Sequence, residues 1–168
     1  MRLIVTLLAL GLCGCATYQY EVIMTPIAKL EPGKSVLIAM PRNGTLAGFG
    51  QGPQYQGSGE QTAAVVQTAF ARFADRATVS SRCSNLSCLQ GEAGIDYRYL
   101  VVPDILRWED WANFWYGAPD LVRVHLVVVD SQSSAEVVSV VISGRSKGLT
   151  HPQKLLIEPI TKYVEGLY

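Results

Sequence analysis

Charged residues are scarce in this chain, and the two signs balance. Asp, Glu, Lys and Arg make up 17% of the 168 residues, and 14 basic residues stand against 14 acidic ones. Proteins that bind nucleic acid need a basic surface to meet the phosphates, so this balance argues against such a partner. His125 and His151 are the only histidines, which leaves few ligands for a metal. We therefore expect no nucleic-acid partner, no metal site and no cofactor.

Long apolar runs are also missing, apart from one at the start. Leu3–Leu12 is a run of ten mostly apolar residues behind the positive Arg2, whereas a membrane-spanning helix needs about 20. Leu12-Cys13-Gly14-Cys15 follows and resembles the bacterial lipobox, in which the last Cys is lipidated and becomes the mature N-terminus. We expect residues 1–14 to be a lipoprotein signal peptide and Cys15 to carry lipid, typically palmitate. The alternative is an ordinary secretory signal.

The residues after Cys15 predict where the protein works. Position 16 is Ala rather than Asp, and Asp there is the usual inner-membrane retention signal. This points to a lipid anchor in the outer membrane, on its periplasmic face. Residues 15–34 contain prolines and no sustained period, so we interpret them as the lipidated N-terminus and a tether. Residues 35–168 are then a single globular periplasmic domain.

Two cysteines remain in that domain. Cys83 and Cys88 form an isolated close pair, which in an oxidising compartment predicts a disulfide. A zinc site would need two more ligands. A catalytic redox pair usually has two residues between its cysteines, where this pair has four.

Apolar patterning predicts the fold class. Ser35–Met40 is a short apolar run typical of a buried strand, and a helix at about 59–74 follows a Ser-x-x-Gln capping box at Ser58. We expect further strands at 77–80, 97–108, 120–130 and 135–143, and a helical turn at 89–94. A last helix begins near His151, as N-cap or first-turn residue, with a kink at Pro159. The order predicts an α/β domain of the α+β type. It has one mixed or mostly antiparallel sheet of about four to five strands and two main flanking helices.

Two other patterns receive structural interpretations. Six glycines lie within residues 42–59, but the Gly-Lys-Ser/Thr ending of a phosphate-binding loop is absent, so we interpret this segment as a connecting loop. Pro103 inside its strand predicts a bulge or an edge position, because proline lacks the ladder donor. His125 alternates with the apolar residues of its strand, which places it beside Arg123 on a polar sheet face.

The densest chemistry follows the strand at 97–108. All three tryptophans lie there among other aromatic residues and carboxylates. Such a loop offers flat faces and acceptors for a sugar or peptide, or rings for a lipid interface. Equally, the rings could fold back as a lid over the core. The candidate binding loop consists of Trp108, Glu109, Asp110, Trp111, Phe114, Trp115 and Tyr116.

Several segments together resemble a known family. They are the lipobox and residues 57–63, 100–110, 141–146 and 151–156. In this order they resemble a family of proteobacterial lipoproteins classed as domain of unknown function 4823. The resemblance implies a lipid-anchored envelope protein and no particular activity, so Cys15 is the only residue whose role it supplies.

Three functions follow as hypotheses. The first is a non-enzymatic envelope module that binds a protein or peptidoglycan through the aromatic loop and an open sheet edge. The second is an envelope hydrolase acting on glycan or peptide through Asp104, Glu109 and Asp110, although strand parity separates Asp104 from Glu109. The third is a structural subunit of an outer-membrane complex. The oligomeric state is left open.

Overall fold

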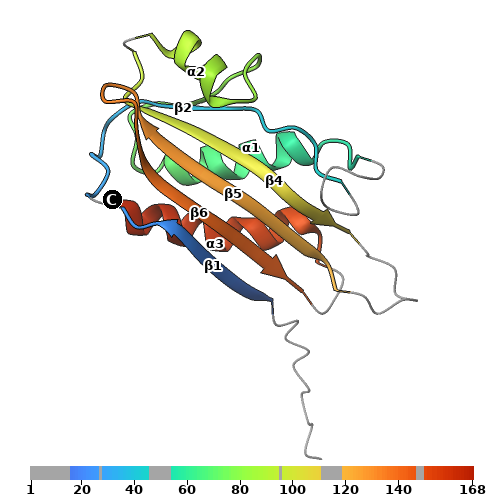
Figure 1. The fold of residues 1–168 in the computed structure, drawn as a ribbon. Helices are drawn as coiled ribbons and strands as arrows, with labels where there is room; N and C mark the ends of the chain where they lie inside the picture. Colours follow the sequence, from blue (N-terminus) through green and yellow to red (C-terminus); the bar gives the residue numbers. More distant parts are fainter. Residues whose placement is uncertain (1–15, 27, 46–53, 95, 111–118, 147–149) are drawn as a thin grey trace, which may run out of the picture.

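The computed structural model describes residues 16–26, 28–45, 54–94, 96–110, 119–146 and 150–168 (Figure 1). These residues form six strands and three helices in one α+β fold, so the predicted fold class is confirmed. The sheet has one strand more than the upper expectation, and one helix more flanks it. In chain order the elements are β1 (Thr17–Met24), β2 (Val36–Ile38), α1 (Ser58–Phe70), β3 (Ala77–Val79), α2 (Leu86–Ala93), β4 (Tyr99–Glu109), β5 (Leu121–Asp130), β6 (Ala135–Arg145) and α3 (Pro152–Leu167).

The sheet is mixed, with strand order β1-β6-β5-β4-β2-β3. β4 and β5, β5 and β6, and β6 and β1 pair antiparallel, whereas β2 runs parallel to both β3 and β4. The short β2 pairs with β4 only over Tyr99–Val101. Val101 accepts a bond from Ala39 on that side, and Pro103, two residues on, has the same orientation. The donor that Pro103 lacks therefore points to the side of β4 beyond the end of the β2 ladder, where no strand pairing needs it.

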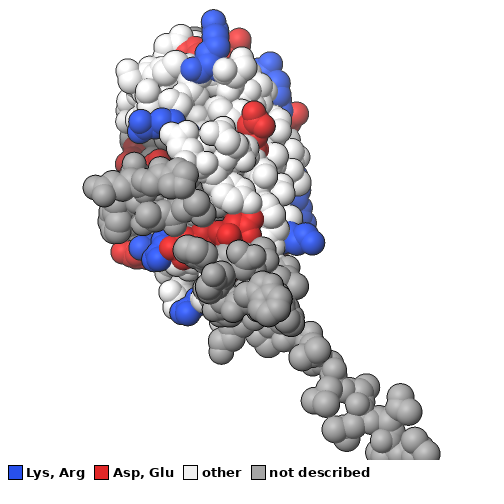
Figure 2. All heavy atoms as spheres, turned by 90° about the vertical axis from the view of Figure 1, so that its right-hand side faces the viewer, with Lys and Arg blue, Asp and Glu red and all other residues white. Residues whose placement is uncertain are grey.

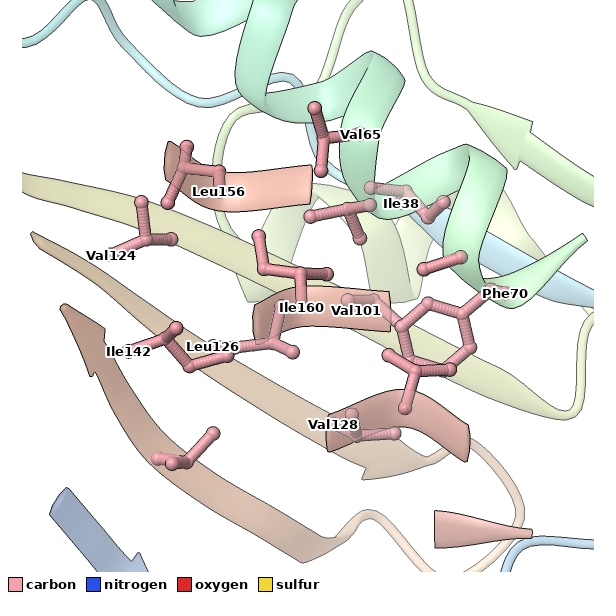
Figure 3. Packing of buried hydrophobic residues seen from close by; sticks show 14 of the residues in the cluster. Ile38, Val65, Phe70, Val101, Val124, Leu126, Val128, Ile142, Leu156 and Ile160 are labelled. Atoms are coloured by element: carbon pink, nitrogen blue, oxygen red, sulfur yellow. The ribbon is translucent and has the colours of Figure 1, made fainter. Parts of the chain in front are cut away.

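Helices α1 and α3 cover one face of the sheet and build the main core (Figure 3). Val124, Leu126 and Val128 alternate along β5 and are fully buried against them, because side chains two apart share a face. Phe70 of α1 and Ile160 of α3 complete this layer. Each such side chain contributes roughly 1.5–3 kcal/mol by leaving water, so this layer holds the helices on the sheet.

Helix α2 lies on the opposite face over a smaller core. Leu37, Leu100 and Leu89 are buried there together with Cys83. The predicted disulfide between Cys83 and Cys88 is present and joins this core to the first turn of α2. The helical turn expected at 89–94 is thus the second half of a longer helix.

The N-terminal segment differs from the expected tether. Residues 17–24 form β1, which pairs with β6 from Thr17 opposite Arg145 onward. Leu30 is buried and donates its backbone N–H to Leu167 of α3 at 2.8 Å. The interpretation of these stretches as a loose tether is therefore wrong, because their backbone is bonded into the domain.

The start of α1 also differs from the prediction. The N-cap is Gly57, in the left-handed conformation at φ 82°, and it makes no side-chain cap bond. Ser58 lies inside the helix, where its hydroxyl donates to the Tyr55 carbonyl at 2.7 Å and accepts from the Gly44 N–H at 2.9 Å. The capping-box prediction is wrong, and the hydroxyl instead fastens two loop segments to the helix. At α3 the prediction is confirmed, since His151 is the N-cap.

A close contact joins α3 to the sheet near Gly144. Pro159 lies inside α3 and has no N–H, so it cannot bond the Leu155 carbonyl one turn earlier. That carbonyl lies against Gly144 of β6, where an added Cβ would lie 2.6 Å from the oxygen. The glycine thus lets the helix approach the strand at the point where the helical ladder is interrupted.

Substitution of Gly144 tests this contact. We expect Gly144→Ala to lower the free energy of unfolding by about 1–3 kcal/mol, because overpacking against backbone shifts the helix. Gly91→Ala in α2 is the matched control, since nothing lies within 4 Å of its added Cβ, and it should be neutral or stabilising by up to about 1 kcal/mol. Urea unfolding of both variants measures the difference, and equal midpoints would contradict the packing argument.

Candidate functional site

The strand ends and helix starts define one end of the molecule, which we call the loop end. Here β4 and β6 finish, β1 and β5 begin, and α1 and α3 start (Figure 1). Figure 2 views the molecule from this side, with acidic side chains lying between the grey segments and basic ones around them. The candidate loop predicted from the sequence leaves β4 at this end.

Trp108 is fully buried at the loop end. Its ring packs at 6.0 Å from the Tyr55 ring and 6.5 Å from the His151 ring, measured between centroids. Gly44 allows the loop to pass so close that an added Cβ would lie 2.8 Å from the Trp108 Cβ. The interpretation of Trp108 as a binding ring is therefore wrong, and the alternative of a lid over the core is correct for this residue.

Asp110 joins Tyr55 and His151 into a polar cluster beside Trp108. The Tyr55 hydroxyl donates to Asp110 Oδ2, and His151 Nε2 lies 3.7 Å from the same oxygen. His151 Nδ1 accepts the Gln153 N–H at 3.3 Å, so in the neutral ring the proton is on Nε2, which faces the carboxylate. The Asp110 hydrogen bond, together with burial and the Asp110 and Asp120 charges, raises the pKa of Tyr55 to about 12.

The carboxylates of the hydrolase hypothesis do not converge. A bulge between Ile105 and Arg107 corrects the parity argument, because it brings Asp104 and Glu109 onto the same sheet face. Their β5 partners, His125 and Leu121, are four residues apart, which places them about 14 Å from one another at ~3.4 Å per residue. Glycosidase pairs lie about 5–9.5 Å apart.

Glu109 and Asp110 are each hydrogen-bonded to another side chain. Glu109 accepts from Arg107 Nε at 2.7 Å, on the same face as Asp104, while Asp110 is bonded to Tyr55 on the helix side. His125, predicted on the polar face, lies 2.9 Å from the Ser139 hydroxyl through Nε2. These contacts stabilise the strands. They bring no two of the hypothesised carboxylates Asp104, Glu109 and Asp110 together as an acid–base pair.

The remaining predicted residues lie outside the described part of the chain. They are Cys15, Trp111, Phe114, Trp115 and Tyr116. Within the described ranges, no three or more His, Cys, Asp or Glu side chains are grouped so that they could hold a metal ion.

An apolar groove lies between β1 and α3, away from the loop-end cluster. It encloses about 500 Å³, and Tyr20 and Val22 of β1 face Tyr163 and Leu167 of α3 across it. The Tyr20 and Tyr163 rings stack at 5.6 Å between centroids. Tyr20 is 43% exposed and Val22 49%, so large apolar side chains meet solvent here. Sequence reasoning missed this groove, although Tyr18, Tyr20 and Val22 alternate in a strand-like pattern.

The fold and its surfaces define a class of protein. It is a one-sheet α+β domain with an apolar groove along an edge strand, and its loop-end groups Glu109, Asp110 and His151 are engaged with neighbouring side chains. A family model described as Domain of unknown function (DUF4823) matches residues 28–167, and the chain belongs to this family. The match begins after β1.

Solved structures share the fold at low identity. A PelC variant from Paraburkholderia phytofirmans, solved as a dodecamer, has a TM-score of 0.62 at 13% identity, covering 90% of this chain and 98% of that chain. A second PelC dodecamer from this organism has a TM-score of 0.58 at 14% identity, with 91% and 97% covered. Protein XCC0632 from Xanthomonas campestris, described as DUF330, has a TM-score of 0.51 at 16% identity, with 88% and 91% covered. No curated protein matches the sequence.

The described residues contain the three helices α1, α2 and α3. None of them combines the length and the apolar character needed to span a bilayer.

Replacing Asp110 tests the loop-end cluster. In the wild type the pKa of Tyr55 is raised to about 12, and Asp110→Asn should lower it toward 10, since the carboxylate is the main cause. Tyrosinate absorbance, with the matching Tyr55→Phe curve subtracted from each titration, isolates this residue. Identical Tyr55 curves with and without the carboxylate would refute the assignment.

The same shift predicts a pH dependence of stability. Because the folded-state pKa lies above the unfolded value of about 10, the hydrogen bond stabilises the fold below pH 10. The contribution is lost as the pH rises toward 12. Tyr55→Phe should therefore lose less stability than the wild type over this interval in denaturant titrations.

Proposed function

We propose that this protein is a lipid-anchored lipoprotein on the periplasmic face of the outer membrane, and that it acts by binding protein rather than by catalysis. Its partner is a second copy of the same chain. The observation that carries the proposal is the exposed edge strand β1 with its apolar groove. The lipobox at Cys15 supports the anchor.

An open strand edge invites pairing. In the described part of the chain, β1 is the last strand of the sheet and has a neighbour only on its β6 side. Natural proteins protect long edges with charge, proline or a covering element. Here Val22 and Ile23 are 49% and 58% exposed at the end of this edge, so a partner that covers the edge would remove apolar surface from water.

Two observations favour a second copy as that partner. The first is electrostatic: removal of residues 1–14 takes one arginine from 14 basic and 14 acidic residues, leaving a net charge of 13 − 14 = −1, so copies repel one another little. The second is that PelC, which shares this fold over nearly its whole length, is solved as a dodecamer. Stable interfaces bury about 1,200–2,000 Å², so the groove would be the apolar centre of a larger contact.

The proposal coincides in part with the third sequence hypothesis, a structural subunit of an envelope assembly. The hydrolase has less support, because Asp104 and Glu109 are held about 14 Å apart by the sheet at ~3.4 Å per residue. Peptidoglycan would call for exposed polar acceptors near flat rings, whereas the groove walls are largely apolar.

A charge in the groove tests self-association. Val22→Glu should weaken association at least tenfold, because the carboxylate loses its hydration in the contact. Ile157→Glu is the matched control, since Ile157 is 48% exposed on α3 outside the groove walls, and it should associate like the wild type. Sedimentation of the detergent-solubilised lipoprotein, with micelles in excess over protein, measures the mass. A monomeric wild type at tens of micromolar would overturn the proposal, and so would equal effects of both variants.

The anchor has its own test. Cys15→Ser should abolish incorporation of radiolabelled palmitate and release the protein from membranes, whereas Cys83→Ser should leave labelling intact. Labelling that persists in Cys15→Ser would refute the anchor without affecting the groove.

A further inference from the structure

The chain between the anchor and the sheet is very short. β1 begins at Thr17, whose pairing partner is Arg145, and Ala16 alone separates it from Cys15. Two residues of extended chain span at most about 7 Å. The tether expected from the sequence would have let the domain stand away from its membrane, and the folded residues 17–24 remove that freedom.

The register of the sheet identifies the end of the molecule that this short chain reaches. Thr17 pairs with Arg145, Arg145 pairs with Leu121, and Leu121 pairs with Glu109. This row runs across four strands at the loop end, and Figure 1 shows β1 beginning there. The anchor therefore emerges from the same end as the Trp108 and Asp110 cluster.

We infer that the loop end is a membrane-docking surface, which rests on the headgroups of the bilayer that holds Cys15. The inference depends on the lipid anchor of the proposed function and adds the orientation. The occupant is the lipid surface itself, because a chain of about 7 Å leaves no room for another protein between this end and the bilayer.

The chemistry of this end suits a headgroup layer. Three of its carboxylates carry little exposed charge: Asp120 is buried, Glu109 is paired with Arg107, and the Asp110 side chain is 9% exposed. Glu60, in the first turn of α1, is exposed. Arg145 is exposed at the row that adjoins the anchor. Lipid phosphates attract such a cation, and acidic groups that are already neutralised or buried add little repulsion.

The orientation places the opposite end in the periplasm. The turn after β5 and helix α2 with its disulfide lie there. β6 connects the two ends with 11 residues, a length of about 35 Å at ~3.3 Å per residue. The β1 edge then rises from the membrane, where it faces copies anchored beside it.

Quenching by labelled headgroups tests the orientation. Single cysteines replace three exposed residues: Thr17 beside the anchor, Gln56 across the loop end, and Ser133 at the far turn. Each added cysteine carries a fluorophore. The label is specific to it, because the lipid on Cys15 and the bond between Cys83 and Cys88 leave no native thiol free in the mature protein. The full lipoprotein is reconstituted in phosphatidylethanolamine–phosphatidylglycerol vesicles that contain headgroup-nitroxide lipid, and flotation first establishes that it is anchored.

We expect strong quenching at Thr17→Cys and Gln56→Cys and at least fivefold weaker quenching at Ser133→Cys. Quenching at the Thr17 position alone would mean contact at a corner and would overturn docking of the whole end, as would equal quenching at all three positions. A protein that fails to float refutes the lipid anchor of the proposed function, and its self-association is tested separately. A floating protein without the expected difference refutes only the orientation.

Lengthening the chain provides the control for its cause. Twelve Gly/Ser residues inserted between Cys15 and Ala16 would span about 20 Å as a flexible coil, so quenching at both loop-end labels should fall by at least half while flotation is unchanged. Undiminished quenching in this variant would contradict the short chain as the cause of docking.

Discussion

Removal of the apolar face of β5 and β6 from water is the constraint on which the other features of this domain depend. Leu126 and Ile142 lie on that face with no exposed surface, and α1 and α3 are the described helices that cover them. Both helices start at the loop end and run back along the strands (Figure 1). Gly144 and Pro159 fit α3 closely to β6, and Trp108 closes the core where the helices begin.

Much of the fold could be predicted, because burial of one face gives the apolar residues of a strand or helix a regular spacing in the sequence. The alternation of Val122, Val124, Leu126 and Val128 fixes the buried face of β5, and the helical stripe of α3 has no other face to turn inward. β1 carries a weaker form of this pattern, because the alternation of Tyr18, Tyr20 and Val22 is followed directly by the apolar Ile23 and Met24. Its pairing with β6 depends on long-range backbone bonds, which a local pattern does not contain.

The candidate site was harder to predict than the fold, for two physical reasons. A tryptophan is the same in the sequence whether its ring contacts a ligand or the core. Burial of Trp108 depends on Tyr55 and His151, which are distant in sequence. The bulge near Ile105 shifts the parity of the residues after it, so counting alone put Asp104 and Glu109 on different faces. Even on the same face, Asp104 and Glu109 form no catalytic pair, because the extended strand keeps them far apart along its length.

The two proposals together restrict how copies of this protein can associate. In copies anchored in one leaflet, every β1 runs away from the membrane, because each begins beside its own Cys15. Antiparallel pairing of two β1 strands, as a two-fold dimer across a sheet edge uses it, needs opposite directions and is excluded by this orientation. β3, the other sheet edge, is parallel to β4 and runs toward the membrane. A contact that covers the β1 edge while both copies stand on the same membrane therefore joins β1 of one copy to a different surface of the next. Such head-to-tail contacts close into rings when the rotation between copies permits.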